Sequence, residues 1–153
     1  MAVIRDASPA DENRILDLWQ QLHEHHDAVQ PVQPSGWNRD PELTSTYIRD
    51  AWAEAPGCRI LVAEVDGLIQ GFVKFAEVSS FYNHAEIQII SVDKEHRGEG
   101  IGSQLMAAAM AYFASQGHPE VELGVVFGNN DAMRLYERLG FQPYLVRYVK
   151  KLG

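Results

Sequence analysis

The 153-residue chain contains one cysteine and no long uncharged apolar segment. A single thiol, Cys58, cannot close an intramolecular disulfide, which favours a reducing compartment, and we expect it to be a small buried apolar side chain. The N-terminal sequence MAVIRDASPADE carries acidic side chains and lacks the apolar core of a signal peptide. No segment has the roughly 20 consecutive apolar residues that cross a bilayer. These absences predict a cytoplasmic protein with no membrane partner.

Basic side chains are also scarce. Thirteen Lys and Arg face twenty-one Asp and Glu, which gives a formal net charge of −8 at pH 7. Residues 1–80 contain six basic and thirteen acidic side chains, whereas residues 81–153 contain seven and eight. A protein that binds the phosphate backbone normally has a basic stripe, so no nucleic acid partner is expected. The length, with 46% hydrophobic and 22% charged residues, predicts one domain over residues 1–153.

Strand and helix patterns alternate along the chain. Ser8, Pro9 and Asp11 form a helix start signal after the first apolar run. Asp66 and Gly67 separate two further apolar runs, which is typical of a β-hairpin. The expected strands cover residues 2–7, 58–65, 68–78, 84–92, 121–127 and 143–150, and the expected helices follow Asp11 and cover residues 40–55, 101–115 and 131–139. This order predicts an α/β fold in which helices pack on a mixed sheet.

The segment from Val92 to Leu105, VDKEHRGEGIGSQL, places three glycines within five residues at the expected start of a helix. Glycines there indicate positive φ angles or a ligand close to the backbone, and an anion is the first candidate ligand at a helix N-terminus. The dinucleotide motif G-x-G-x-x-G fails because Ser103 stands where the third glycine belongs. The P-loop motif fails because no lysine follows Gly102. The remaining pattern, R-x-x-G-x-G from Arg97, predicts a turn that holds a pyrophosphate.

This turn, together with the strand EIQIISV before it, resembles the GNAT superfamily of acetyl-CoA-dependent N-acetyltransferases. A later segment, NNDAMRLYERLGF, matches the family pattern N-x-x-A-x-x-L-Y-x-x-x-G-F at Asn129, Ala132, Leu135, Tyr136, Gly140 and Phe141. The resemblance covers nearly the whole chain in the order of its elements. It implies a mixed, mostly antiparallel central sheet flanked by about four helices, the GNAT-like acyl-CoA N-acyltransferase fold.

The resemblance also implies where acetyl-CoA binds as the cosubstrate. Backbone groups near Ile90 and Val92 would pair with the pantetheine arm, and Asn129 would add a further contact. The diphosphate would be held by the turn and the first helical residues, Arg97, Gly98, Gly100, Ile101, Gly102 and Ser103. No metal is expected.

Acetyl transfer to an amine requires a neutral nucleophile, a stabilised oxyanion and a protonated sulfur leaving group. Tyr136 is the candidate acid, because a phenol with a pKa near 10 lies about one to two units above a thiol. The alternative is an aromatic side chain that only packs a short helix on the sheet. By the resemblance, a backbone N–H near Val92 would stabilise the oxyanion.

The candidate base is Glu86. The stretch HAEIQI resembles the segment that carries the catalytic glutamate in histone acetyltransferase members of the family. Strand alternation places His84, Glu86 and Gln88 on one face of the sheet. A glutamate is a weak base for an ammonium ion, so Glu86 would act through water and by holding the cation. An exposed sheet carboxylate or a simple substrate anchor remains the alternative.

The acceptor is expected to be a cationic amine. In the family the first half of the chain shapes the acceptor side, and here that half carries most of the negative charge. We therefore expect direct transfer to a primary amine on a small molecule such as a polyamine or an aminoglycoside. The alternatives are a protein or peptide amine, a non-catalytic acyl-CoA-binding sensor, and acidity that serves solubility alone.

Two further expectations concern packing. Trp19 is expected in the core, whereas Trp37, Tyr47 and Trp52 either line the acceptor pocket or belong to the core. A homodimer is common in the family, and the expected last strand, residues 143–150, is a candidate interface.

Overall fold

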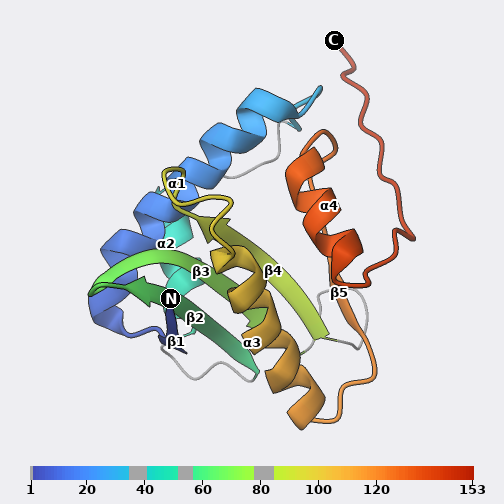
Figure 1. Ribbon diagram of the computed structural model, residues 1–153. Helices are drawn as coiled ribbons and strands as arrows, with labels where there is room; N and C mark the ends of the chain where they lie inside the picture. Colours follow the sequence, from blue (N-terminus) through green and yellow to red (C-terminus); the bar gives the residue numbers. More distant parts are fainter. Residues whose placement is uncertain (1, 35–40, 52–56, 78–84) are drawn as a thin grey trace.

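The computed structural model describes residues 2–34, 41–51, 57–77 and 85–153 (Figure 1). Its strands form one sheet in the order β1-β2-β3-β4-β5. The strands are β1 (Val3–Asp6), β2 (Cys58–Val65), β3 (Leu68–Ala76), β4 (Ala85–Val92) and β5 (Val121–Leu123). The helices are α1 (Glu12–Val29), α2 (Pro41–Arg49), α3 (Ile101–Ser115) and α4 (Asn130–Arg138).

The strand pairing makes this a mixed sheet. β1 to β4 are antiparallel neighbours, and β5 lies parallel to β4. The hairpin between β2 and β3 turns at Asp66, with φ 52°, and Gly67, with φ 78°. The predicted fold, a mostly antiparallel mixed sheet with four helices, is confirmed. His84, Trp37 and Trp52 lie outside the described residues.

The sheet buries side chains on both faces. Val73 and Phe75 of β3 pack under α3, whereas Phe72 packs with α1 and α2 on the opposite face. Each buried phenylalanine contributes about 1.5–3 kcal/mol relative to an exposed one. Trp19, expected in the core, packs at the edge of the α1 and α2 cluster, with its ring centroid 5.7 Å from that of Tyr47.

The start signal before α1 forms as predicted. The Ser8 backbone N–H donates to the Asp11 carboxylate at 2.8 Å, and Pro9 opens a short 3₁₀ turn, Pro9–Asp11. The Arg5 guanidinium donates to the same carboxylate at 2.9 and 3.1 Å. These bonds from Arg5 lower the pKa of Asp11 against the opposing effect of burial. The start of α1 is thereby fixed to β1.

The prediction of a last strand over residues 143–150 is wrong. Residues 141–153 form neither helix nor strand, and β5 ends at Leu123 instead of Phe127. Figure 1 shows the C-terminal segment running as an extended trace beside α4 and away from the sheet. A strand forms only where a neighbour supplies backbone hydrogen bonds, and a three-residue β5 offers little edge to pair with. The β-branched and aromatic residues within 143–150 favour an extended segment but do not specify a partner strand.

Candidate active site

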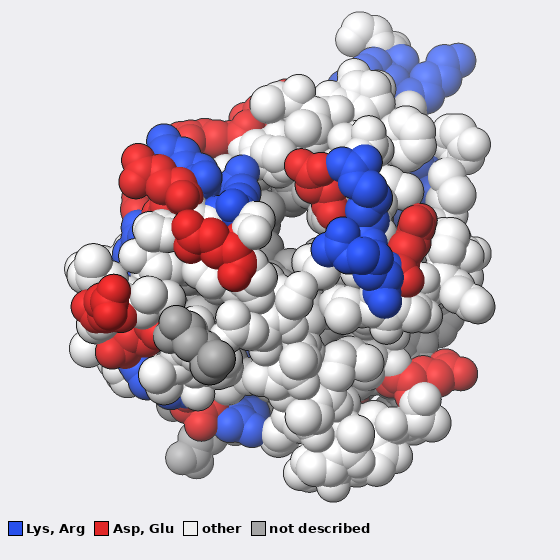
Figure 2. Space-filling model, in the orientation of Figure 1, with Lys and Arg blue, Asp and Glu red and all other residues white. Residues whose placement is uncertain are grey.

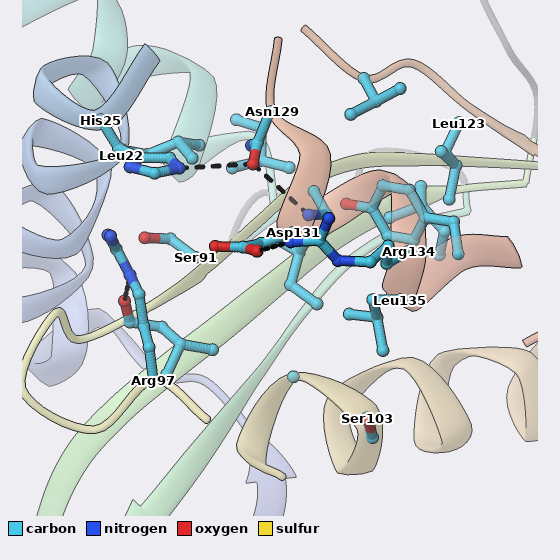
Figure 3. A pocket seen from close by; sticks show the side chains of 18 of the residues that line it. Leu22, His25, Ser91, Arg97, Ser103, Leu123, Asn129, Asp131, Arg134 and Leu135 are labelled. Atoms are coloured by element: carbon cyan, nitrogen blue, oxygen red, sulfur yellow. Dashed lines mark hydrogen bonds and ion pairs between the residues drawn. The ribbon is translucent and has the colours of Figure 1, made fainter. Parts of the chain in front are cut away.

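The sheet opens between β4 and β5. The two strands pair only where Ala85–Ile87 meets Val121–Leu123, so the rest of β4 diverges from β5 in the described part of the chain. A cavity of about 970 Å³ lies in this opening, between β4, the start of α3, α4 and the C-terminal half of α1 (Figure 3). Ile90 and Val92, the predicted partners of a pantetheine arm, line the cavity from β4. The divergence leaves a stretch of β4 backbone facing the cavity.

The turn between β4 and α3 forms one end of this cavity. Gly98 has φ 83° and Gly100 has φ 84°, left-handed values that other residues adopt at a cost. No other atom lies within 4 Å of a Cβ built at either position, so both glycines serve the backbone conformation and leave open space. The backbone conformation of this turn therefore explains two of the three glycines in the pattern, Gly98 and Gly100.

The first turn of α3 presents its N–H groups at the cavity. Gly100 is the N-cap, and none of the described side chains caps this helix end. The first N–H groups of a helix have no partner within the helix, and they carry its positive dipole end. Ile101, Gly102 and Ser103 line the cavity at this point. The arrangement suits a diphosphate.

Arg97 lies at the mouth of the cavity. Its Nε donates to the Val92 carbonyl at 3.2 Å, which leaves the rest of an exposed guanidinium beside the glycine turn. Nδ1 of His96 lies 3.1 Å from a carboxylate oxygen of Glu99 across the turn. A charge-assisted contact from Arg97 to a bound phosphate is therefore compatible with the structure.

The α4 side of the cavity contains residues that sequence reasoning missed. Arg134 and Arg138 line it, one helical turn apart, and Arg134 also pairs with Asp131. Figure 2 shows basic side chains gathered over α4 beside a hollow in the surface. The i, i+3 and i, i+4 spacing of charged residues on this short helix was the available signal. With Arg97 they make this wall positive, although the whole chain is acidic.

Asn129 connects the two sides of the cavity. It is buried, it caps α4 by accepting the Ala132 N–H at 3.4 Å, and it lines the cavity as the family pattern implied. Its Oδ1 also lies 3.3 Å from Nε2 of His25, which comes from α1. Sequence reasoning did not single out His25, because the pair is 104 positions apart.

Tyr136 lies in the cavity wall with 8% of its surface exposed, and its ring packs against Phe141. Burial raises the pKa of its phenol to about 12. The phenol therefore stays protonated over the whole physiological range. The gap to a thiol near 8.5 is about twice as wide as the sequence-based expectation assumed.

Glu86 does not line the cavity with Tyr136. Burial, and then the negative charge of Glu86, raise the pKa of Tyr47 on α2, so Glu86 belongs to the α1 and α2 side of the sheet. Lys74, a second residue that sequence reasoning missed, is 1% exposed on this side. Its Nζ lies 3.7 Å from the centre of the Tyr47 ring and donates to the Gln88 side chain, which does line the cavity. Burial lowers the pKa of Lys74.

Neither a metal centre nor a membrane span is indicated by the described residues. Their His, Cys, Asp and Glu side chains form no group of three or more suited to a metal ion. Among the same residues, no helix has both the length and the apolar character needed to cross a bilayer.

The chain matches known proteins in the elements that build this site. A family model described as the acetyltransferase (GNAT) family covers residues 19–141. The chain belongs to this family. The solved structure of the aminoglycoside N-acetyltransferase AAC(6')-Iy in complex with CoA has a TM-score of 0.75 and 19% identity, over 99% of this chain and 96% of that one. At that identity the likeness concerns the fold.

Curated relatives are similar over most of this chain. The mycothiol acetyltransferase of Acidimicrobium ferrooxidans is 34% identical over 127 residues, which cover 82% of this chain and 39% of the relative. The L-amino acid N-acyltransferase MnaT of Escherichia coli is 29% identical over 143 residues, which cover 90% of this chain and 78% of the relative. The chain thus spans well under half of the mycothiol acetyltransferase and most of the amino acid acyltransferase.

Proposed function

We propose that the protein is an N-acetyltransferase that moves the acetyl group of acetyl-CoA directly to a primary amine. The observation that carries this proposal is the meeting of two features at one cavity, the diverging edge of β4 and the uncapped, glycine-led start of α3. An extended amide-containing arm can pair with the strand edge while a diphosphate lies on the helix N-terminus. The family assignment over residues 19–141 supports the same reading.

Each catalytic role has a candidate in this chain. Acetyl-CoA supplies an activated thioester. A backbone N–H of β4 near Val92 would stabilise the oxyanion that forms when the amine attacks the carbonyl carbon. As the carbon–sulfur bond breaks, the phenol of Tyr136 would donate a hydrogen bond and then its proton to the departing sulfur. Because its pKa is about 12, the phenol enters the reaction fully protonated.

The acceptor must lose a proton from its ammonium form to attack as a neutral amine, and this proton needs a second route. Glu86 would accept it through water or hold the cation, and its electrostatic effect on Tyr47 of α2 supports a role on the α1 and α2 side of the sheet. Gln88 links that side to the cavity, because it lines the cavity and contacts Lys74. Glu86 is thus a base or an anchor at a distance from Tyr136, on the acceptor side.

The acceptor that we propose is a small cationic amine, such as a polyamine or an aminoglycoside. Its support is the charge difference between the two halves of the chain, since an acidic acceptor side concentrates cations. The relatives named above are, by their names, enzymes that act on small molecules. A protein amine and a non-catalytic acyl-CoA sensor remain the alternatives. A reducing, cytoplasmic setting agrees with the single cysteine.

We also propose a homodimer. The C-terminal segment, residues 141–153, exposes large apolar side chains that a monomer leaves in water. They are Tyr144, Leu145, Val146, Tyr148, Val149 and Leu152. A contiguous set of this kind usually marks a protein interface.

A turnover screen tests activity and acceptor together. The protein is incubated with acetyl-CoA and, in separate reactions, polyamines, aminoglycosides, neutral and anionic amino acids, and peptides, and the release of free thiol is followed. We expect turnover with at least one small cationic amine. Calorimetric binding of CoA without any turnover would support the sensor, and selective binding of NAD over CoA would end the acetyltransferase proposal.

A further inference from the structure

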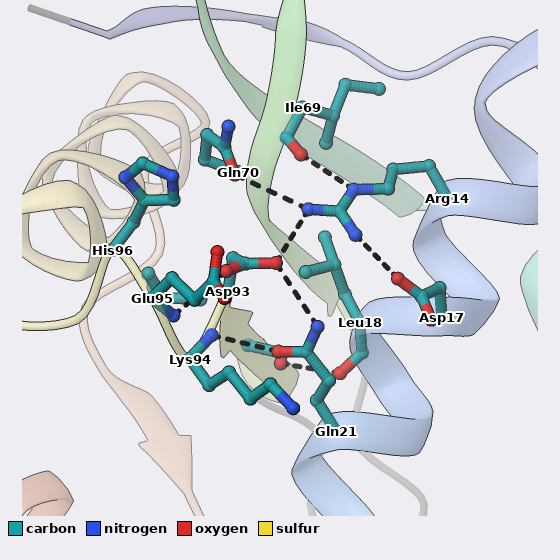
Figure 4. A network of polar contacts seen from close by, with 12 residues as sticks. Arg14, Asp17, Leu18, Gln21, Ile69, Gln70, Asp93, Lys94, Glu95 and His96 are labelled. Carbon is teal, nitrogen blue, oxygen red and sulfur yellow. Dashed lines mark hydrogen bonds and ion pairs between the residues drawn. The ribbon is translucent and has the colours of Figure 1, made fainter.

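A buried carboxylate stands at the start of the turn between β4 and α3, residues 93–100, which we call the coenzyme turn. Asp93 follows β4 directly and is 7% exposed (Figure 4). Its Oδ2 accepts hydrogen bonds from Nη2 of Arg14 at 2.8 Å and Nε2 of Gln21 at 3.2 Å. Its Oδ1 accepts the Glu95 backbone N–H at 2.9 Å. One side chain therefore connects α1 with the first residues of the turn.

The same two α1 residues make further contacts around Asp93. Gln21 accepts the Lys94 backbone N–H at 2.9 Å, so it holds the turn by its backbone as well. The Nε of Arg14 donates to the Ile69 carbonyl of β3 at 2.9 Å. We call Arg14, Gln21 and Asp93 the clamp. It joins α1, β3 and the turn at one point.

The glycines of the coenzyme turn give its backbone conformational freedom, which an anchor at Asp93 would restrict. Between Asp93 and α3 it contains two glycines in left-handed conformations, each of which can adopt many other backbone states when unbound. Ligand binding to the α3 N-terminus requires the N–H groups to converge, and any freedom left in the turn is lost on binding at a cost in affinity. A fixed origin at Asp93, with the His96 N–H donating to the Asp93 carbonyl at 2.9 Å, reduces that freedom.

We propose that Arg14, Gln21 and Asp93 are positioning residues that hold the coenzyme turn in the geometry that binds a diphosphate. The inference rests on the proposed function, because it gives the clamp a role in CoA affinity. Since Leu22 and His25 of the same helix line the cavity, α1 contributes to both the wall of the cavity and the placement of the turn.

The test measures the dissociation constant of CoA by calorimetry, at a temperature where circular dichroism shows each variant to be folded. Asp93→Asn keeps the shape but replaces an acceptor by a donor group facing Arg14 and Gln21. We expect it to weaken CoA binding by about tenfold, the effect of one lost charge-assisted hydrogen bond. Gln21→Met removes both Gln21 contacts and should weaken binding by several-fold. This second variant decides the question if Asp93→Asn does not fold.

Asp17 supplies a matched control. Its carboxylate pairs with Nη1 of the same Arg14 at 2.5 Å but is 59% exposed, and Figure 4 shows it on the side of Arg14 away from Lys94 and Glu95. Asp17→Asn should leave CoA affinity within about twofold, because an exposed pair contributes little. The double variant Arg14→Met, Asp93→Asn should bind CoA no more weakly than Asp93→Asn, since both residues act as one unit.

The outcomes separate this inference from the function on which it rests. A wild-type protein that does not bind CoA overturns the proposed function, and the role of the clamp with it. Wild-type binding with unchanged affinity in folded Asp93→Asn and Gln21→Met leaves the function standing and overturns the clamp. Equal weakening by Asp17→Asn would also overturn it, because the effect would then belong to the charge of Arg14 and not to the contact with Asp93.

Discussion

The phenol of Tyr136 lies in the cavity wall, and burial raises its pKa to about 12, so it is fully protonated at neutral pH but is a weaker acid than an exposed phenol. Tyr136→Phe removes only the hydroxyl. We expect kcat for acetyl-CoA turnover to fall by about 10²-fold, as for a lost general acid, with unchanged CoA affinity. Wild-type kcat should show no alkaline limb from this residue below about pH 10, because the raised pKa keeps the acid form present.

Tyr112 provides the comparison for Tyr136. It lies on α3, packs against Phe75 and Phe113, and does not line the cavity. Tyr112→Phe should leave kcat unchanged. Equal turnover by both variants and the wild type would mean that Tyr136 only packs α4 on the sheet and that water protonates the thiolate.

Asp93 also links the site to acid stability. Burial alone would raise the pKa of this carboxyl, but hydrogen bonds from Arg14, the Glu95 N–H and Gln21 lower it to about 2. The folded state therefore favours the ionised form, and the resulting stability is present above the unfolded pKa, near 4, and is lost as pH falls toward 2. The loss should amount to about 2 kcal/mol.

Urea unfolding at pH 6 and at pH 2 measures this loss. Wild-type stability should fall more steeply between the two values than that of Asp93→Asn, which has no carboxyl to protonate at this position. Asp11, whose pKa is lowered in the same direction, contributes equally to both proteins and cancels in the comparison. Parallel pH profiles for the two proteins would contradict the assignment.

At the scale of elements, α3 offers a matched pair of glycines. Gly100 begins the helix with φ 84° and Gly117 follows its end with φ 79°, and neither has another atom within 4 Å of a built Cβ. A side chain at either position costs about 1–2 kcal/mol of stability through the left-handed backbone. Only Gly100, however, faces the cavity.

Aspartate at these two glycines should therefore give different results. Gly100→Asp places a negative charge where a diphosphate is proposed to bind, and we expect CoA affinity to fall by at least about tenfold. Gly117→Asp should lower the melting temperature by a similar amount and leave CoA affinity within about twofold. If calorimetry shows equal affinity for both variants, the diphosphate lies elsewhere.

The elements differ in how far the sequence predicts them. The turn from Arg97 to Ser103 is local, and its glycines and the start of α3 lie where the pattern placed them. Residues 143–150 are rich in the β-branched and aromatic residues that favour strands, yet a strand exists only with a partner, and composition does not specify one. Arg14 and Asp93 are 79 positions apart, and the buried Lys74 contacts Tyr47 of α2 and Gln88 of β4. Such contacts depend on packing that no single stretch encodes.

At the scale of the whole molecule, the residues around the cavity differ in charge from the protein as a whole. The net charge is −8, but Arg97, Arg134 and Arg138 surround the cavity that would take an anionic cosubstrate. The fold thus combines an acidic exterior, which suits cations and solubility, with one basic wall. This division is the structural counterpart of the difference in charge between the two halves of the sequence.

The exposed apolar side chains of the C-terminal segment, residues 141–153, lead to a prediction about assembly. In this segment Tyr148 is 94% exposed and Val146 is 68% exposed. The last strand of the sheet, β5, has only three residues and so offers a short edge. A second copy that covers these side chains would remove apolar surface from water, and closed two-fold dimers are the commonest assembly that does so. Sedimentation equilibrium should therefore give about twice the monomer mass of 17.2 kDa at micromolar concentration.

The double variant Val146→Glu, Tyr148→Glu should sediment as a monomer, because two charges in an apolar interface cost several kcal/mol. Leu68→Glu, at a position 65% exposed in the β2–β3 hairpin, should remain dimeric. A monomeric wild type, or a dimer that the double variant leaves intact, would rule out an interface at this segment.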